Sequence, residues 1–73
     1  MLRETIGQNL KAQRQKLGLT QNEAAKRCGM PVKTYGRIER GKENTTLETL
    51  EKITLGLGTT IQQLLTETID EAN

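Results

Sequence analysis

Residues 20–41 have the sequence TQNEAAKRCGMPVKTYGRIERG, which predicts two short helices joined by a tight turn. The first helix begins with a capping box, in which the Thr20 hydroxyl and the Glu23 carboxylate each satisfy a free backbone N–H. We expect this helix to run from Gln21 to Cys28. Its inner face carries small side chains that let another helix approach closely: Ala24, Ala25 and Cys28.

A second helix follows the glycine turn. Gly29 can take the left-handed conformation that ends a helix, and the fixed φ of Pro31 suits the first turn of the next helix. We expect that helix from about residue 31 to residue 39 or 40. Tyr35 and Ile38 form its apolar pair and face the core. The outer face is expected to carry Val32, Lys33, Gly36, Arg37 and Arg40.

A longer helix precedes this pair. Apolar residues recur at helical spacing between Leu2 and Leu17, which predicts an amphipathic helix ended by Gly18. Its inward stripe is expected to comprise Leu2, Ile6, Leu10, Ala12, Gln13 and Leu17.

Two further helices follow. Thr46 is placed to cap a fourth helix that ends at Gly58, and Thr60 with Gln63 forms a capping box that opens a fifth. We expect Leu55 to face outward. The inward residues are expected to be Leu47, Leu50, Ile53 and Leu57 in the fourth helix, and Ile61, Leu64, Leu65 and Ile69 in the fifth. The chain is thus predicted to be all-α, one five-helix domain over residues 1–73, with residues 66–73 extending the last helix.

Charge is divided unevenly along these 73 residues. Residues 1–42 hold ten Lys or Arg and three Glu, a net charge of +7, whereas residues 43–73 hold one Lys and six acidic residues, a net charge of −5. A basic front half raises the expectation of a polyanionic partner, although an uneven solvated surface would give the same totals.

Composition excludes several classes of function. The chain has no His and no Ser, so a hydroxyl nucleophile paired with an imidazole base is absent. Its one cysteine, Cys28, cannot complete a zinc site or an internal disulfide and is interpreted as a small buried residue. No apolar run approaches the roughly 18 residues of a membrane span. We therefore expect no enzyme, metal, cofactor or membrane segment, and a cytoplasmic protein.

The motifs above resemble those of the phage-repressor and Cro-like (XRE-type) helix-turn-helix transcriptional regulators. The resemblance spans residues 6–65 and rests on Arg14, residues 17–21, Ala25, Gly29, residues 37–42, residues 47–50 and residues 57–58. It implies a lambda-repressor-like DNA-binding domain, with the helix-turn-helix at the second and third helices, that binds the major groove of double-stranded DNA.

The resemblance also implies roles for particular residues. The candidates for reading bases are Val32, Lys33, Thr34 and Arg37, each of which could instead contact phosphate or only solvent. The candidates for contacting phosphate are Gln21, Arg40, Lys42 and Asn44. Arg14 and Glu39 are expected to form a structural ion pair rather than to contact DNA. Gly36 could allow a close approach to DNA, or could have no function.

The family resemblance further implies a symmetric homodimer on a two-fold operator. The acidic half of the chain would face away from DNA and carry the dimer contact, with Leu55, Ile61 and Ile69 as candidates. A restriction-modification controller, a prophage repressor or a Cro-like protein would fit this description. The alternative is an antitoxin-type subunit whose main role is to bind a toxin protein.

Overall fold

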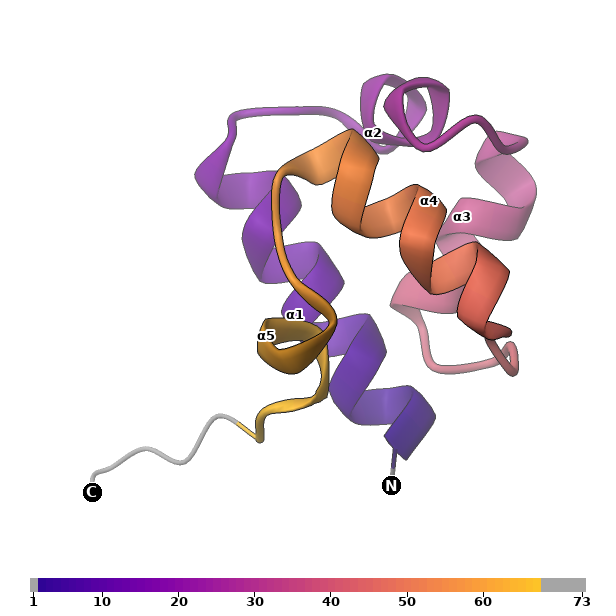
Figure 1. Cartoon of the computed structure of the whole chain (residues 1–73). Coiled ribbons are helices and arrows are strands. Elements are labelled where there is room, and N and C mark those ends of the chain that lie inside the picture. The colour runs from indigo at the N-terminus through magenta and orange to yellow at the C-terminus, as the bar shows by residue number, and fades with distance from the viewer. Residues whose placement is uncertain (1, 68–73) are drawn as a thin grey trace.

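A computed structural model describes residues 2–67, which form five helices and no strand (Figure 1). The helices are α1 (Leu2–Lys16), α2 (Gln21–Arg27), α3 (Val32–Glu39), α4 (Leu47–Leu57) and α5 (Ile61–Leu65). The predicted all-α class is therefore confirmed. Within the described range, no helix has the length and apolar composition needed to cross a bilayer.

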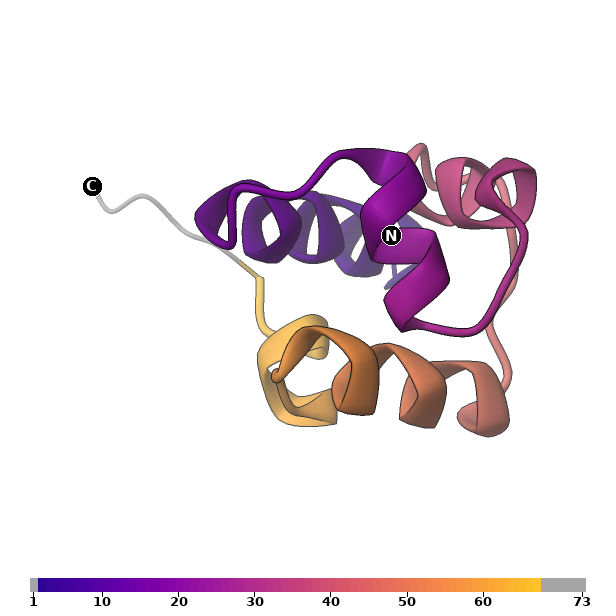
Figure 2. The ribbon, with the colours of Figure 1, turned by 90° about the horizontal axis from the view of Figure 1, so that it is seen from above.

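The helices form two layers around a small core. Viewed from above, α4 and α5 lie together on one side, and α1, α2 and α3 lie on the other (Figure 2). Cys28 is 3% exposed, and burial raises the pKa of its thiol to about 11, as expected of a small buried side chain. The largest fully buried side chains are Tyr35, Leu10, Ile38, Ile53, Leu57 and Leu64.

Local capping interactions begin the helices where the sequence predicted. The Thr20 hydroxyl accepts from the backbone N–H of Glu23 at 3.1 Å, and the Glu23 carboxylate accepts from that of Thr20 at 2.8 Å. The same capping box recurs at the start of α5, and Thr46 caps α4. At the other ends, Gly18 and Gly58 have φ of 71° and 65°, the left-handed region that glycine adopts without steric cost.

Several helix ends differ from the predicted bounds. α1 and α2 each end one residue earlier than expected, and Pro31 is the N-cap of α3 rather than part of it. The predicted extension of the last helix through residues 66 and 67 is wrong, because α5 ends at Leu65. The Asn9 amide of α1 donates to the carbonyls of Leu64 and Thr66 at 2.7 and 2.8 Å, and the backbone of Thr66 is extended. Residues 68–73 lie outside the described range.

Five residues that were expected to face inward are exposed. Leu47 is 74% exposed because it is the first residue of α4, and the buried face of that helix begins one turn later at Leu50. Leu17 is 40% exposed because the chain turns at Gly18, and Leu19 packs against the core in its place. The others are Leu2, which is 61% exposed, Ala12, and Leu65, which is 38% exposed.

Two glycines inside helices bring backbones close together. A Cβ at Gly7 of α1 would lie 2.5 Å from the carbonyl oxygen of Glu39 at the end of α3. A Cβ at Gly56 of α4 would lie 2.6 Å from the carbonyl oxygen of Arg27 at the end of α2. Both approaches involve backbone atoms, which cannot move aside as a flexible side chain can. Glycine at these positions therefore sets how closely the helices pack.

We predict that Gly7→Ala lowers the free energy of unfolding by about 1 to 3 kcal/mol, because the added methyl group would force α1 away from α3. Urea unfolding of the two proteins measures the difference. Gly36→Ala is the matched control, since it places the same methyl group inside α3. There it would meet Arg40 Nη1 at 3.2 Å, at the movable end of a long side chain.

Alanine is favoured over glycine in a helix interior by about 1 kcal/mol, so the control protein should be as stable as the wild type or more stable. Equal stabilities of the Gly7→Ala protein and the wild type would show that the α1–α3 approach does not require glycine.

Candidate nucleic-acid interface

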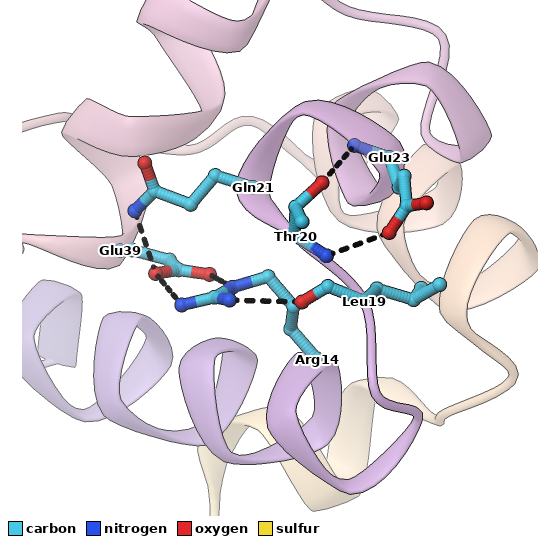
Figure 3. A network of polar contacts seen from close by, with 6 residues as sticks. All are labelled: Arg14, Leu19, Thr20, Gln21, Glu23 and Glu39. Carbon is cyan, nitrogen blue, oxygen red and sulfur yellow. Dashed lines mark hydrogen bonds and ion pairs between the residues drawn. The ribbon is translucent and has the colours of Figure 1, made fainter.

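Three helices meet at the carboxylate of Glu39, the last residue of α3 (Figure 3). Arg14 of α1 donates to it twice, from Nε to Oε2 at 2.6 Å and from Nη2 to Oε1 at 3.2 Å. Gln21, the first residue of α2, donates from Nε2 to Oε1 at 3.0 Å. Arg14 also donates from Nη1 to the carbonyl oxygen of Leu19 at 3.0 Å. The expected ion pair between Arg14 and Glu39 is therefore present, and Gln21 takes part in it.

The ion pair between Arg14 and Glu39 is largely buried. The side chain of Glu39 is 2% exposed and that of Arg14 is 13% exposed. Burial of Glu39 opposes its ionisation, but the hydrogen bonds from Arg14 and Gln21, the nearby Tyr35 hydroxyl and the positive charge of Arg14 together hold the carboxyl pKa below its ordinary value of 4.5. Glu39 is thus charged at neutral pH, and its buried charge is stabilised by both donors.

Gln21 was expected to contact a phosphate or to be an exposed residue at the start of a helix. It is half-buried rather than exposed, and its amide nitrogen donates to Glu39. A side-chain amide nitrogen carries two N–H donors, of which this bond uses one. Gln21 can therefore be held in place by Glu39 and still donate to a second acceptor.

The candidates for reading bases lie on α3, and three of the four are exposed. Val32 is 43% exposed, Lys33 and Arg37 are also exposed, and Thr34 is half-buried. Tyr35 and Ile38 are 0% and 1% exposed and pack into the core as predicted. The further phosphate candidates are exposed just after this helix: Arg40, Lys42 and Asn44.

Gly36 does not lie on the outer face of α3 as expected, because it is buried. A Cβ at this position would lie 3.2 Å from Arg40 Nη1 and 3.6 Å from Gln21 Oε1. The glycine therefore leaves room for two polar side chains, which come from α2 and from the end of α3. It does not present bare backbone to a ligand.

A polar groove of about 450 Å³ lies beside the Glu39 network, and it includes Lys11 of α1 as well as the two phosphate candidates Gln21 and Arg40. Lys11 is not among the residues that the sequence singled out. The sequence did contain a signal, since Lys11 precedes Arg14 by three residues and so shares its helix face. The residues around the groove are Glu4, Gln8, Lys11, Arg14, Gln21, Glu39 and Arg40.

Glu43 is a second residue that the sequence did not single out. It lies in the loop between α3 and α4, where its carboxylate accepts from Arg37 Nε at 2.8 Å. The two residues are separated by six positions and by the turn at Gly41, so no helical spacing relates them.

Of the three candidates for a dimer contact, two lie on α4 and α5, in the layer away from α3, and the third lies outside the described range (Figure 2). Leu55 of α4 is 86% exposed, as expected. Ile61 of α5 is half-buried and packs against the core. Ile69 lies outside residues 2–67.

A family model described as "Helix-turn-helix" (HTH_3) matches residues 10–64, which include α2, α3, α4 and part of each remaining helix. The chain is 34% identical over 67 residues to the uncharacterized HTH-type transcriptional regulator y4dJ of Sinorhizobium fredii, covering 92% of this chain and 87% of that protein.

Two control proteins are also similar. The control protein C.MunI from a Mycoplasma species is 37% identical over 57 residues, covering 78% of this chain and 77% of the relative. The crystal structure of the restriction-modification controller protein C.AhdI from Aeromonas hydrophila superimposes with a TM-score of 0.80 at 29% identity, covering 85% of this chain and 94% of that one.

We predict that Glu39→Ala lowers the free energy of unfolding by about 3 kcal/mol or more, because it leaves the largely buried charge of Arg14 without its partner. Thermal unfolding measures the loss. Glu43→Ala is the matched control. It breaks an ion pair whose side chains are 50% and 37% exposed, and such pairs contribute about 0 to 1 kcal/mol.

Acid unfolding gives an independent check on the same network. Because the pKa of Glu39 is lowered in the folded protein, the ionised carboxylate adds to the free energy of unfolding above about pH 4.5. This stabilisation is lost as the pH falls through the folded pKa. The alanine variant should lack this part of the pH dependence. A Glu39→Ala melting temperature within a degree or two of the wild type would contradict the role of the network.

Proposed function

Because the chain belongs to the helix-turn-helix (HTH_3) family of DNA-binding transcriptional regulators, we propose that it binds a two-fold DNA operator as a homodimer and that α3 contacts the bases. The resemblance found in the sequence is thereby confirmed, and the family consists of regulators rather than enzymes.

The exposed basic face of α3 and of the loop after it carries the proposal. An α-helix fits the major groove, where arginine and lysine can donate to the O6 and N7 atoms of guanine. Tyr35 and Ile38 hold the opposite face of α3 in the core, so the helix is presented as a rigid element. The exposed cations of this face are Lys33, Arg37, Arg40 and Lys42.

A homodimer is proposed because one copy of α3 can contact only a few base pairs. Two copies related by a two-fold axis would place their recognition helices about 34 to 36 Å apart on one face of the duplex. Since α4 and α5 lie on the side away from α3, a dimer contact there would leave α3 free (Figure 2). The exposed Leu55 and the acidic Glu48 and Glu51 of α4 are consistent with a surface turned away from phosphates.

Among regulators of this family, we favour a restriction-modification controller over a prophage repressor or a Cro-like protein, because two of the relatives described above are control proteins. The antitoxin-type alternative gains less support. A protein partner does not require a group of exposed cations on α3 and the loop after it, whereas such a group is suited to the phosphate backbone of DNA.

We predict that the protein binds duplex DNA with an affinity that falls by about tenfold or more between roughly 50 and 200 mM salt, since each neutralised phosphate contributes about −0.9 to the slope of log K against log salt. Electrophoretic mobility shift assays over a salt series measure this slope. Sedimentation of the complex should show two protomers on each bound duplex. An affinity that does not change with salt would count against DNA as the partner.

A preferred duplex can be selected by the wild-type protein from a pool of random sequences. We further predict that Arg37→Ala reduces the preference for this duplex over other duplexes, because a good bidentate contact to guanine is worth about 1 to 3 kcal/mol of discrimination. Lys42→Ala should weaken binding to all duplexes by a similar factor, because a phosphate contact does not distinguish bases. Binding of both variants to a site selected from random duplex and to a scrambled duplex measures the difference.

Gln21→Ala should also weaken all duplexes about equally, but it removes a donor to Glu39, so its melting temperature must be measured alongside. Lys42→Ala serves as the cleaner comparison for this reason. If Arg37→Ala and Lys42→Ala ranked the duplexes alike, Arg37 would not be a base-reading residue.

A further inference from the structure

The Arg37 side chain, a candidate for reading bases, is already bound by a carboxylate of this chain. Arg37 Nε donates to Glu43 Oε1 at 2.8 Å, from α3 to the loop that follows it. Both side chains are partly exposed, at 50% and 37%. The pair therefore lies on the surface that the proposed function assigns to DNA.

Neither fold stability nor general affinity for DNA explains a carboxylate at this place. An exposed ion pair contributes little to folding, because water screens it and two side chains lose freedom. A carboxylate among the exposed cations Arg40 and Lys42 also repels phosphates and weakens binding to every duplex. The side-chain contact that Glu43 does make is with Arg37.

The hydrogen bond restricts how Arg37 can donate. A guanidinium carries five N–H donors in a planar fork, one on Nε and two on each terminal nitrogen. With the Nε donor given to Glu43, a bidentate contact can be made only end-on, through the two terminal nitrogens. The bond also holds a long side chain in one orientation, and ordering it before binding lowers the entropic cost of making the contact.

We infer that Glu43 is a positioning residue that holds Arg37 with its terminal nitrogens free to donate to a guanine. It increases the discrimination between sequences and lowers the affinity for all of them. This inference rests on the proposed function, because it requires α3 to contact bases.

Three single variants separate positioning from charge. Glu43→Ala removes both the carboxylate and the acceptor for Arg37, whereas Glu43→Gln removes the charge but keeps an oxygen that can accept from Nε. Glu67→Gln is the charge-matched control, on an exposed position after the end of α5. Each protein is titrated against the duplex selected by the wild type and against a scrambled duplex of the same composition, at two salt concentrations.

We expect Glu43→Ala to bind the scrambled duplex more tightly than the wild type and to lose discrimination by about fivefold or more, the lower end of what one bidentate contact provides. Glu43→Gln should also bind more tightly but keep most of the discrimination. Glu67→Gln should keep all of the discrimination. In an Arg37→Ala background, Glu43→Ala should change the discrimination no further.

The outcomes separate this inference from the proposed function. If the wild type showed no salt-dependent binding to duplex, both would fail. If the wild type discriminated between duplexes and Arg37→Ala lost that discrimination while Glu43→Ala retained it, only the role of Glu43 would be overturned. A loss of discrimination in Glu67→Gln equal to that in Glu43→Ala would overturn it as well, since charge alone would then explain the effect.

Discussion

The carboxylate of Glu39 is the group on which the arrangement of the first three helices depends. It ends α3 with a side chain that is 2% exposed, and it receives donors from Arg14 of α1 and Gln21 of α2. A buried charge without a partner is strongly destabilising, so the three helices must pack in the orientation that brings these donors together. Arg14 also donates to the carbonyl of Leu19, which ties the connection between α1 and α2 to the same point.

Close backbone contacts at two glycines also determine how the helices pack. The chain has one aromatic residue and buries mainly Leu, Ile and Ala, so its core is small for a domain of this size. Gly7 and Gly56 compensate by letting α1 approach the end of α3, and α4 the end of α2, to distances that a methyl group would prevent. Dense packing of short helices thus replaces the area that larger side chains would bury.

The contacts that bury one side of α3 also determine which of its side chains are exposed. Because Tyr35, Ile38 and Glu39 are held on the inner side of α3, the exposed side chains of that helix are left facing outward as one rigid set. Gln21 links the Glu39 carboxylate to the proposed DNA surface, since one of its amide donors is bonded to Glu39 at the margin of the same groove as Arg40. Buried charge, helix orientation and the proposed DNA surface are therefore parts of one arrangement.

Local chemistry in the sequence determined the five helices and, apart from the end of α5, their limits to within about one residue, whereas the tertiary structure alone decided which side chains meet. Caps such as Thr20 with Glu23, and stops such as Gly18, act within about four residues, so they can be identified without knowledge of the fold. Helical periodicity also placed Tyr35 and Ile38 in the core, and the four base-reading candidates that the family resemblance implied lie on α3. It could not show that Leu47 lies beyond the edge of the core, that Gly36 is covered by Gln21 and Arg40, or that Glu43 binds Arg37. Periodicity states which residues share a helix face, but the burial and partner of each residue depend on where neighbouring helices cross and where loops return.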